Sequence, residues 1–193
     1  FVPRKTIRII FGTDEESGMS DITHYLEEEV PPIFGFTPDC KYPVVYGERG
    51  IVNVTIHLPL SKVDLTKISE FKGDQSRDHV PDLLSVRINE KEYPILGKRS
   101  PSNAPELGEN ALTLLAKKLK DIPDIPEQLK HYFSWIFQCF HDKHYGEGLG
   151  LTLADEDSGK LILTPVTLQK KTDGLNLEVA FRYPVSATEK QVV

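Results

Sequence analysis

The order of hydrophobic and polar residues predicts both strands and helices in the first third of the chain. Residues 5–12 are rich in β-branched side chains and end on a glycine, which predicts a short buried strand. Ser20 starts a stretch with an acidic first turn, which is typical of a capped helix. Residues 42–60 are expected to form two strands separated by Gly47 and Gly50.

The remaining two thirds contain the clearest helices. Residues 110–120 place three leucines on one face, and residues 127–140 place three phenylalanines and an isoleucine on one face. Turn residues at Asn89-Glu90 and Asp173-Gly174 predict two hairpins. Because strands and helices come in runs, we expect an α+β fold with helices on one face of an antiparallel sheet.

Composition and charge exclude several classes of protein. The chain has 193 residues, with 23 basic and 29 acidic side chains, for a net charge of −6. An acidic chain of this kind is not expected to bind nucleic acid or an anionic membrane. No apolar run approaches the roughly 20 residues of a membrane-spanning helix. Its two cysteines suit a reducing compartment, so we expect a cytoplasmic protein.

Three adjacent carboxylates, Asp14, Glu15 and Glu16, directly follow the first predicted strand. Adjacent carboxylates repel one another, so a metal dication is a candidate for the compensating charge. Neighbouring residues point in different directions, so one glutamate could hold a metal while the other handles a proton. The alternative is a solvated acidic turn.

Other polar residues carry weaker signals. Asp39 follows a proline and by itself suits a turn. His141 and His144 lie three residues apart where a helix is expected to end, so they suit either a small metal site or a helix terminus. The glycines of residues 146–150 are expected to form a flexible connection rather than a nucleotide-binding loop.

Six motifs, in order, span nearly the whole chain. They are GTDEESGMSDITHYLEEE, GFTPDCKYPVVYGERG, GDQSRDHVPD, GKRSPSNAPELGENALTLLAKKL, HYGEGLGLTLADEDSGKLILTPV and FRYP. Together they closely resemble the zinc-dependent dipeptidases of the carnosinase, aminoacylase and bacterial dipeptidase V type. The resemblance implies two zinc ions bridged by an aspartate and a water that attacks the peptide carbonyl.

The same resemblance assigns roles to individual residues. It implies Glu15 as the general base, with Glu16 and Asp39 as zinc ligands. It implies Arg182 as a contact to the substrate carboxylate. Residues 1–49 would be a strip of an α/β zinc-peptidase catalytic domain, and residues 50–193 an antiparallel lid domain of the dimerisation type that lacks its C-terminal end.

The chain departs from the family pattern at two lid positions. Asp78 stands where the family usually has an asparagine, and Pro101 stands where it has the histidine that polarises the substrate carbonyl. The family's other zinc ligands fall outside this chain. We therefore expect an incomplete or inactive portion of an enzyme that hydrolyses dipeptides.

Two other functions remain open. One is a non-catalytic, lid-type interaction or dimerisation module. The other is an unrelated hydrolase that uses Glu15 and Glu16 alone. Self-association is expected through the tail strands or through the 127–140 helix, because an apolar face built from Phe133, Ile136, Phe137 and Phe140 could be left uncovered.

Overall fold

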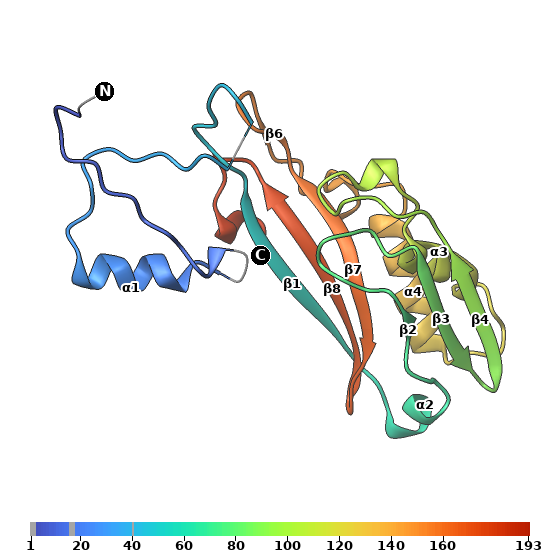
Figure 1. Ribbon diagram of the computed structural model, residues 1–193. Helices are drawn as coiled ribbons and strands as arrows, with labels where there is room; N and C mark the ends of the chain where they lie inside the picture. The colour runs from blue at the N-terminus through green and yellow to red at the C-terminus, as the bar shows by residue number, and fades with distance from the viewer. Residues whose placement is uncertain (1–2, 16–17, 40) are drawn as a thin grey trace. The chain divides into compact units, whose positions relative to one another are not determined.

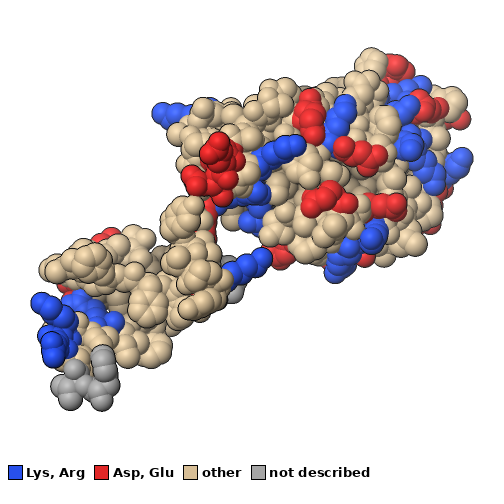
Figure 2. Space-filling view, turned by 90° about the horizontal axis from the view of Figure 1, so that it is seen from above, with Lys and Arg blue, Asp and Glu red and all other residues tan. Residues whose placement is uncertain are grey.

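The computed structural model describes residues 3–15, 18–39 and 41–193, and the chain divides into two compact units, Phe1–Val45 and Tyr46–Val193. The larger unit contains all of the described strands (Figure 1). The division falls shortly before Gly50, where the lid domain is predicted to begin. Lysine, arginine, aspartate and glutamate side chains are interspersed over the larger unit on the face shown in Figure 2.

The smaller unit has one described helix, α1 (Ser20–Glu28), as the sequence predicts. Residues 5–12 form no strand, and their apolar side chains are exposed, Ile9 at 73% and Phe11 at 87%. The strand prediction is therefore wrong for this structure. A strand is stable only beside another strand, and the described residues of this unit provide none.

A three-stranded antiparallel sheet, in the order β1-β8-β7, organises the larger unit (Figure 1). Its strands are β1 (Gly50–Pro59), β7 (Ile162–Lys170) and β8 (Gly174–Tyr183). Only one strand forms within residues 42–60, so the prediction of two strands there is wrong. Because β8 lies between β1 and β7, it has no free edge for self-association.

A second sheet has the order β2-β3-β4. Its strands are β2 (Lys72–Gly73), β3 (Leu83–Ile88) and β4 (Lys91–Leu96). Asn89 and Glu90 connect β3 to β4 with φ angles of 46° and 64°. Two consecutive left-handed residues are what a two-residue hairpin turn requires, so the hairpin prediction is confirmed.

Short elements complete the larger unit. They are α2 (Lys62–Thr66), η2 (Pro105–Leu107), η3 (Glu147–Leu149), β5 (Ala154–Asp155), β6 (Gly159–Lys160) and η4 (Glu189–Gln191). No described helix is long and apolar enough to cross a membrane.

Helices α3 (Ala111–Leu119) and α4 (Glu127–Phe140) pack into a single core with both sheets. The side chain of Asn110 accepts a hydrogen bond from the Leu112 amide at 2.9 Å, which caps α3. Antiparallel sheets packed with helices confirm the α+β class. Phe133 and Phe140 of α4 are buried in this core, so the prediction that the α4 face is uncovered is wrong. The sheet and α3 supply the surface that covers it.

Asp155 joins the β5–β6 turn to the segment that follows β8. Its carboxylate accepts hydrogen bonds from the Ser158 amide at 2.6 Å, the Ser158 hydroxyl at 2.8 Å and the Ser186 amide at 3.0 Å. The bond from the Ser158 amide, and next that from Ser186, hold the pKa of Asp155 well below its usual range. The ionised carboxylate therefore stabilises the folded state.

Asp155→Asn is expected to lower the urea midpoint at pH 7, and the difference from the wild type should shrink at pH 3. In the unfolded chain Asp155 has an ordinary pKa near 4, so its stabilisation is fully present above about pH 4 and declines as the pH falls towards the lower folded value. Urea unfolding at the two pH values measures this. Glu156→Gln, on the exposed neighbouring residue, is the control. If Asp155→Asn lowers the urea midpoint by the same amount at pH 7 and at pH 3, the stabilising role of the ionised Asp155 carboxylate is contradicted.

Candidate functional site

Two of the acidic residues near α1 fix the turn that leads into the helix. The Asp14 carboxylate accepts hydrogen bonds from the Ser20 amide at 3.0 Å and from the Ser20 hydroxyl. The Asp21 carboxylate accepts hydrogen bonds from the amides of Thr13 and Asp14, the latter at 3.1 Å. The bond from Thr13 contributes most to lowering the pKa of Asp21. Both carboxylates thus have a local structural role.

The residues predicted for catalysis and zinc binding are Glu15, Glu16 and Asp39. Glu15 and Asp39 are both exposed, and Glu16 lies outside the described residues. Within residues 3–15, 18–39 and 41–193, no group of three or more His, Cys, Asp or Glu side chains is placed to hold a metal ion. A closed zinc site needs about four ligands. The described donors therefore do not fit the zinc pair by themselves.

The two positions predicted to depart from the family pattern, Asp78 and Pro101, lie side by side in the larger unit. His79 forms an isolated antiparallel bridge with Pro101. On either side of it, the Ser102 amide donates to the Asp78 carbonyl at 2.9 Å and the Val80 amide donates to the Ser100 carbonyl at 2.8 Å. Residues 78–80 and 100–102 therefore form a paired segment, although more than 20 residues separate Asp78 from Pro101 in the sequence.

This paired segment lies over the sheet face that carries Arg182. The Thr164 hydroxyl donates to the Ser102 carbonyl at 2.8 Å. Thr164 pairs with Ala180 across the sheet, and Ile162 pairs with Arg182. Side chains two residues apart on a strand share a face, so Thr164 and Arg182 project from the same side. The tertiary structure thus brings all three predicted lid positions to one face.

Several polar atoms of the paired segment and of Arg182 are buried without a hydrogen-bond partner among the described residues. They are His79 Nε2, Ser100 Oγ, Ser102 Oγ and Arg182 Nε, of which His79 Nε2 lies 3.5 Å from Asp74 Oδ1 in an ion-pair contact. Buried polar groups in proteins are nearly always paired, so each of these atoms can form a hydrogen bond with a water or a polar ligand. Sequence reasoning missed His79, Ser100 and Ser102, because their spacing carries no signal and only the tertiary structure pairs the two segments that contain them.

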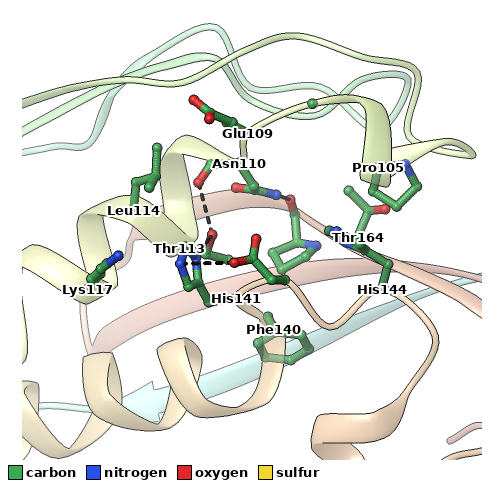
Figure 3. Close-up of a pocket in the computed structure, with 13 residues that line it drawn as sticks. Pro105, Glu109, Asn110, Thr113, Leu114, Lys117, Phe140, His141, His144 and Thr164 are labelled. Atoms are coloured by element: carbon green, nitrogen blue, oxygen red, sulfur yellow. Dashed lines mark hydrogen bonds and ion pairs between the residues drawn. The ribbon is translucent and has the colours of Figure 1, made fainter.

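A cavity of about 250 Å³ lies elsewhere in the larger unit, where the start of α3, the end of α4 and β7 meet (Figure 3). His141 and His144 both line it, together with Thr113 and Lys117. His141 ends α4, as one of the two sequence-based interpretations expects, but its side chain is only 16% exposed. The structure therefore places the two histidines in a shared cavity rather than on an open surface.

Comparison with known proteins identifies the family. No family model matches the chain. The "Putative dipeptidase YtjP" of Bacillus subtilis (strain 168) is 28% identical over 221 aligned residues, covering 97% of this chain and 48% of the relative. The "Putative dipeptidase SAUSA300_1697" of Staphylococcus aureus (strain USA300) is 34% identical, covering 94% of this chain and 46% of the relative. The chain belongs to a dipeptidase family.

Another relative in this dipeptidase family has a more specific name. The "Beta-Ala-Xaa dipeptidase" of Lactobacillus delbrueckii subsp. lactis is 28% identical over 198 aligned residues, which cover 86% of this chain and 41% of the relative. The chain spans somewhat less than half the length of these dipeptidases.

Proposed function

We propose that this chain forms part of a metal-dependent dipeptidase, with residues 1–49 in the catalytic domain and residues 50–193 in the lid. The observation that carries the proposal is the similarity to proteins named dipeptidases, which extends over 97% of the chain in one case. The substrates would be dipeptides, and the name of one relative points to dipeptides that begin with β-alanine. The cytoplasm is the proposed location.

The proposed roles in the smaller unit follow the family resemblance. Glu15 is the general base, and Glu16 and Asp39 are ligands of a pair of zinc ions. Since the described donors do not close a metal site, the zinc ions would need further ligands besides Glu16 and Asp39. The chain alone is therefore proposed to bind zinc weakly.

Arg182 is proposed to bind the C-terminal carboxylate of the dipeptide. A guanidinium binds a carboxylate through parallel hydrogen bonds, and Arg182 Nε is buried without an acceptor among the described residues. Its position on the face that also carries the 78–80 and 100–102 segments supports a substrate-facing role.

The neighbouring positions lower the expected activity. Pro101 has no N–H to offer an oxyanion, and the Asp78 carboxylate is an acceptor with a negative charge. Losing one donor at an oxyanion site typically costs about 10²–10³ in rate. We therefore propose that the chain by itself has no measurable dipeptidase activity.

Peptide binding tests this function most directly. Titration of the chain with β-alanyl-alanine, followed by NMR shifts, should show binding about tenfold tighter than that of the C-terminal amide of the same peptide. Arg182→Gln should remove this preference, and Arg87→Gln, on an exposed arginine of β3, should retain it. Equal binding of the acid and the amide to the wild type would overturn the proposal for Arg182.

A non-catalytic interaction or dimerisation module is the second candidate. It is supported by β1, which lies at an edge of the three-stranded sheet among the described strands. An unpaired strand edge favours association with another strand. Self-association of the chain, together with no peptide binding in the titration above, would favour this alternative.

A further inference from the structure

The cavity at the junction of α3 and α4 contains a hydrogen-bonding arrangement that the proposed dipeptidase function does not use. Thr113 lies in the first turn of α3, and His141 follows the end of α4 (Figure 3). Asp142 is the next residue along the chain and also lines the cavity. All of these residues belong to the larger unit. The cavity is therefore defined without reference to the position of residues 1–45.

The hydrogen bonds of Thr113 favour the tautomer of His141 that carries its proton on Nδ1. The Thr113 hydroxyl donates its one hydrogen to the Asn110 carbonyl at 3.0 Å. Its oxygen lies 3.2 Å from His141 Nδ1, so it accepts the Nδ1–H. Burial, followed by the nearby charges of Lys117 and His144, lowers the pKa of His141, although Asp142 opposes this. At neutral pH the imidazole is uncharged and Nε2 presents a lone pair.

That lone pair lies opposite a second acceptor. His141 Nε2 is 3.5 Å from Asp142 Oδ2, and the Asp142 side chain is 86% exposed at the mouth of the cavity. Neither atom carries a hydrogen when the imidazole is neutral and its proton is on Nδ1. Two facing acceptors, one of them anionic, are best satisfied by a cationic group with several N–H bonds. A primary ammonium has this chemistry.

The rest of the lining supplies an opposite charge and an apolar wall. Lys117 lines the same cavity, and none of the described carboxylates lies within 4.0 Å of its ammonium. Glu109 adds a second negative charge, and Leu114 and Phe140 add apolar surface. Lys117 can therefore bind a carboxylate of a ligand while the side chain of that ligand contacts Leu114 and Phe140.

We propose that this cavity binds a free α-amino acid with an apolar side chain. The ammonium group lies between His141 Nε2 and Asp142, and the carboxylate faces Lys117. The volume of about 250 Å³ is below the roughly 300–1,000 Å³ of pockets for drug-sized ligands, which suits a small zwitterion. Amino acids are the products of dipeptide hydrolysis, so a role for this cavity in binding product rests on the proposed function. The binding of an amino acid to the cavity does not depend on that function.

Leucine and two analogues test the site on the intact chain. Shift titrations of the ¹⁵N-labelled protein should show leucine binding with perturbed Thr113 and His141 signals. Binding should be at least about fivefold weaker for 4-methylpentanoate, which lacks the ammonium group, and for 3-methylbutylamine, which lacks the carboxylate. Equal binding of all three compounds, or the absence of perturbation at these residues, would overturn the proposal.

Four variants separate this site from the peptide site. Asp142→Asn should weaken the binding of leucine about five- to tenfold and leave the binding of 4-methylpentanoate unchanged. Lys117→Met should weaken the binding of leucine and leave the binding of 3-methylbutylamine unchanged. Lys118→Met is the matched control, because Lys118 adjoins Lys117 without lining the cavity. Arg182→Gln should not change leucine binding. If leucine binds here and dipeptides fail to bind at Arg182, the product role fails and the amino-acid site stands.

Discussion

Phe133→Ala is expected to lower the free energy of unfolding of the larger unit by about 3–5 kcal/mol, the usual cost of truncating a fully buried aromatic side chain. Phe133 is 1% exposed, and its ring centroid lies 6.1 Å from that of Tyr132. Its removal leaves a cavity between α4 and the rest of the core that close packing cannot easily refill. Urea unfolding followed by the fluorescence of Trp135, the single tryptophan, measures the change.

Phe137→Ala provides the matched control on the same helix. Phe137 is only partly buried, and it stacks on His141 with centroids 4.8 Å apart. Its truncation is expected to cost about 1–2 kcal/mol, because less apolar surface leaves the solvent when it folds. A loss for Phe137→Ala that equals or exceeds that of Phe133→Ala would show that the core is not centred on Phe133.

Gly148→Ala is expected to destabilise the larger unit by about 3 kcal/mol, at the upper end of the range for overpacking. A Cβ at this position would lie 2.6 Å from the Cys139 Cα and closer still to the Cys139 carbonyl. These are backbone atoms of α4, so relief requires η3 and the end of the helix to move apart. The connection predicted to be flexible is instead packed tightly against α4.

Gly150→Ala separates this packing effect from backbone conformation. Gly150 has a φ of 72°, and no atom lies within 4 Å of a Cβ placed there. Alanine should therefore cost only the strain of a left-handed residue, about 1–2 kcal/mol. Thermal unfolding of both variants measures the difference. If Gly150→Ala is the more destabilising of the two, the packing of Gly148 against Cys139 does not limit stability.

Elements with local signals were predictable from the sequence. The turn at Asn89-Glu90 formed as expected, because Asn89 tolerates a left-handed φ angle and the flanking segments alternate. Helix α3 formed where Asn110 precedes an amphipathic run, because the cap and the apolar face are both encoded within a few residues. Such features need no knowledge of distant segments.

Elements that depend on a distant partner were predicted less well. Residues 5–12 have strand-like composition, but a strand needs a neighbour and the described part of the smaller unit offers none. The apolar face of α4 was predicted correctly. The prediction that this face is uncovered was wrong, because the strands and α3 that cover it come from other parts of the chain. Periodicity identifies an apolar face without identifying what packs against it.

The candidate sites were also predictable from the sequence only in part. The amino-acid sequence alone determined the family resemblance and the residues worth testing, namely Glu15, Glu16, Asp39, Asp78, Pro101 and Arg182. Only the tertiary structure placed Asp78, Pro101 and Arg182 at one sheet face, and brought His141 to Thr113 beside a cavity. The physical reason is that strand register and helix packing set these contacts between residues far apart in the chain, which no local pattern encodes.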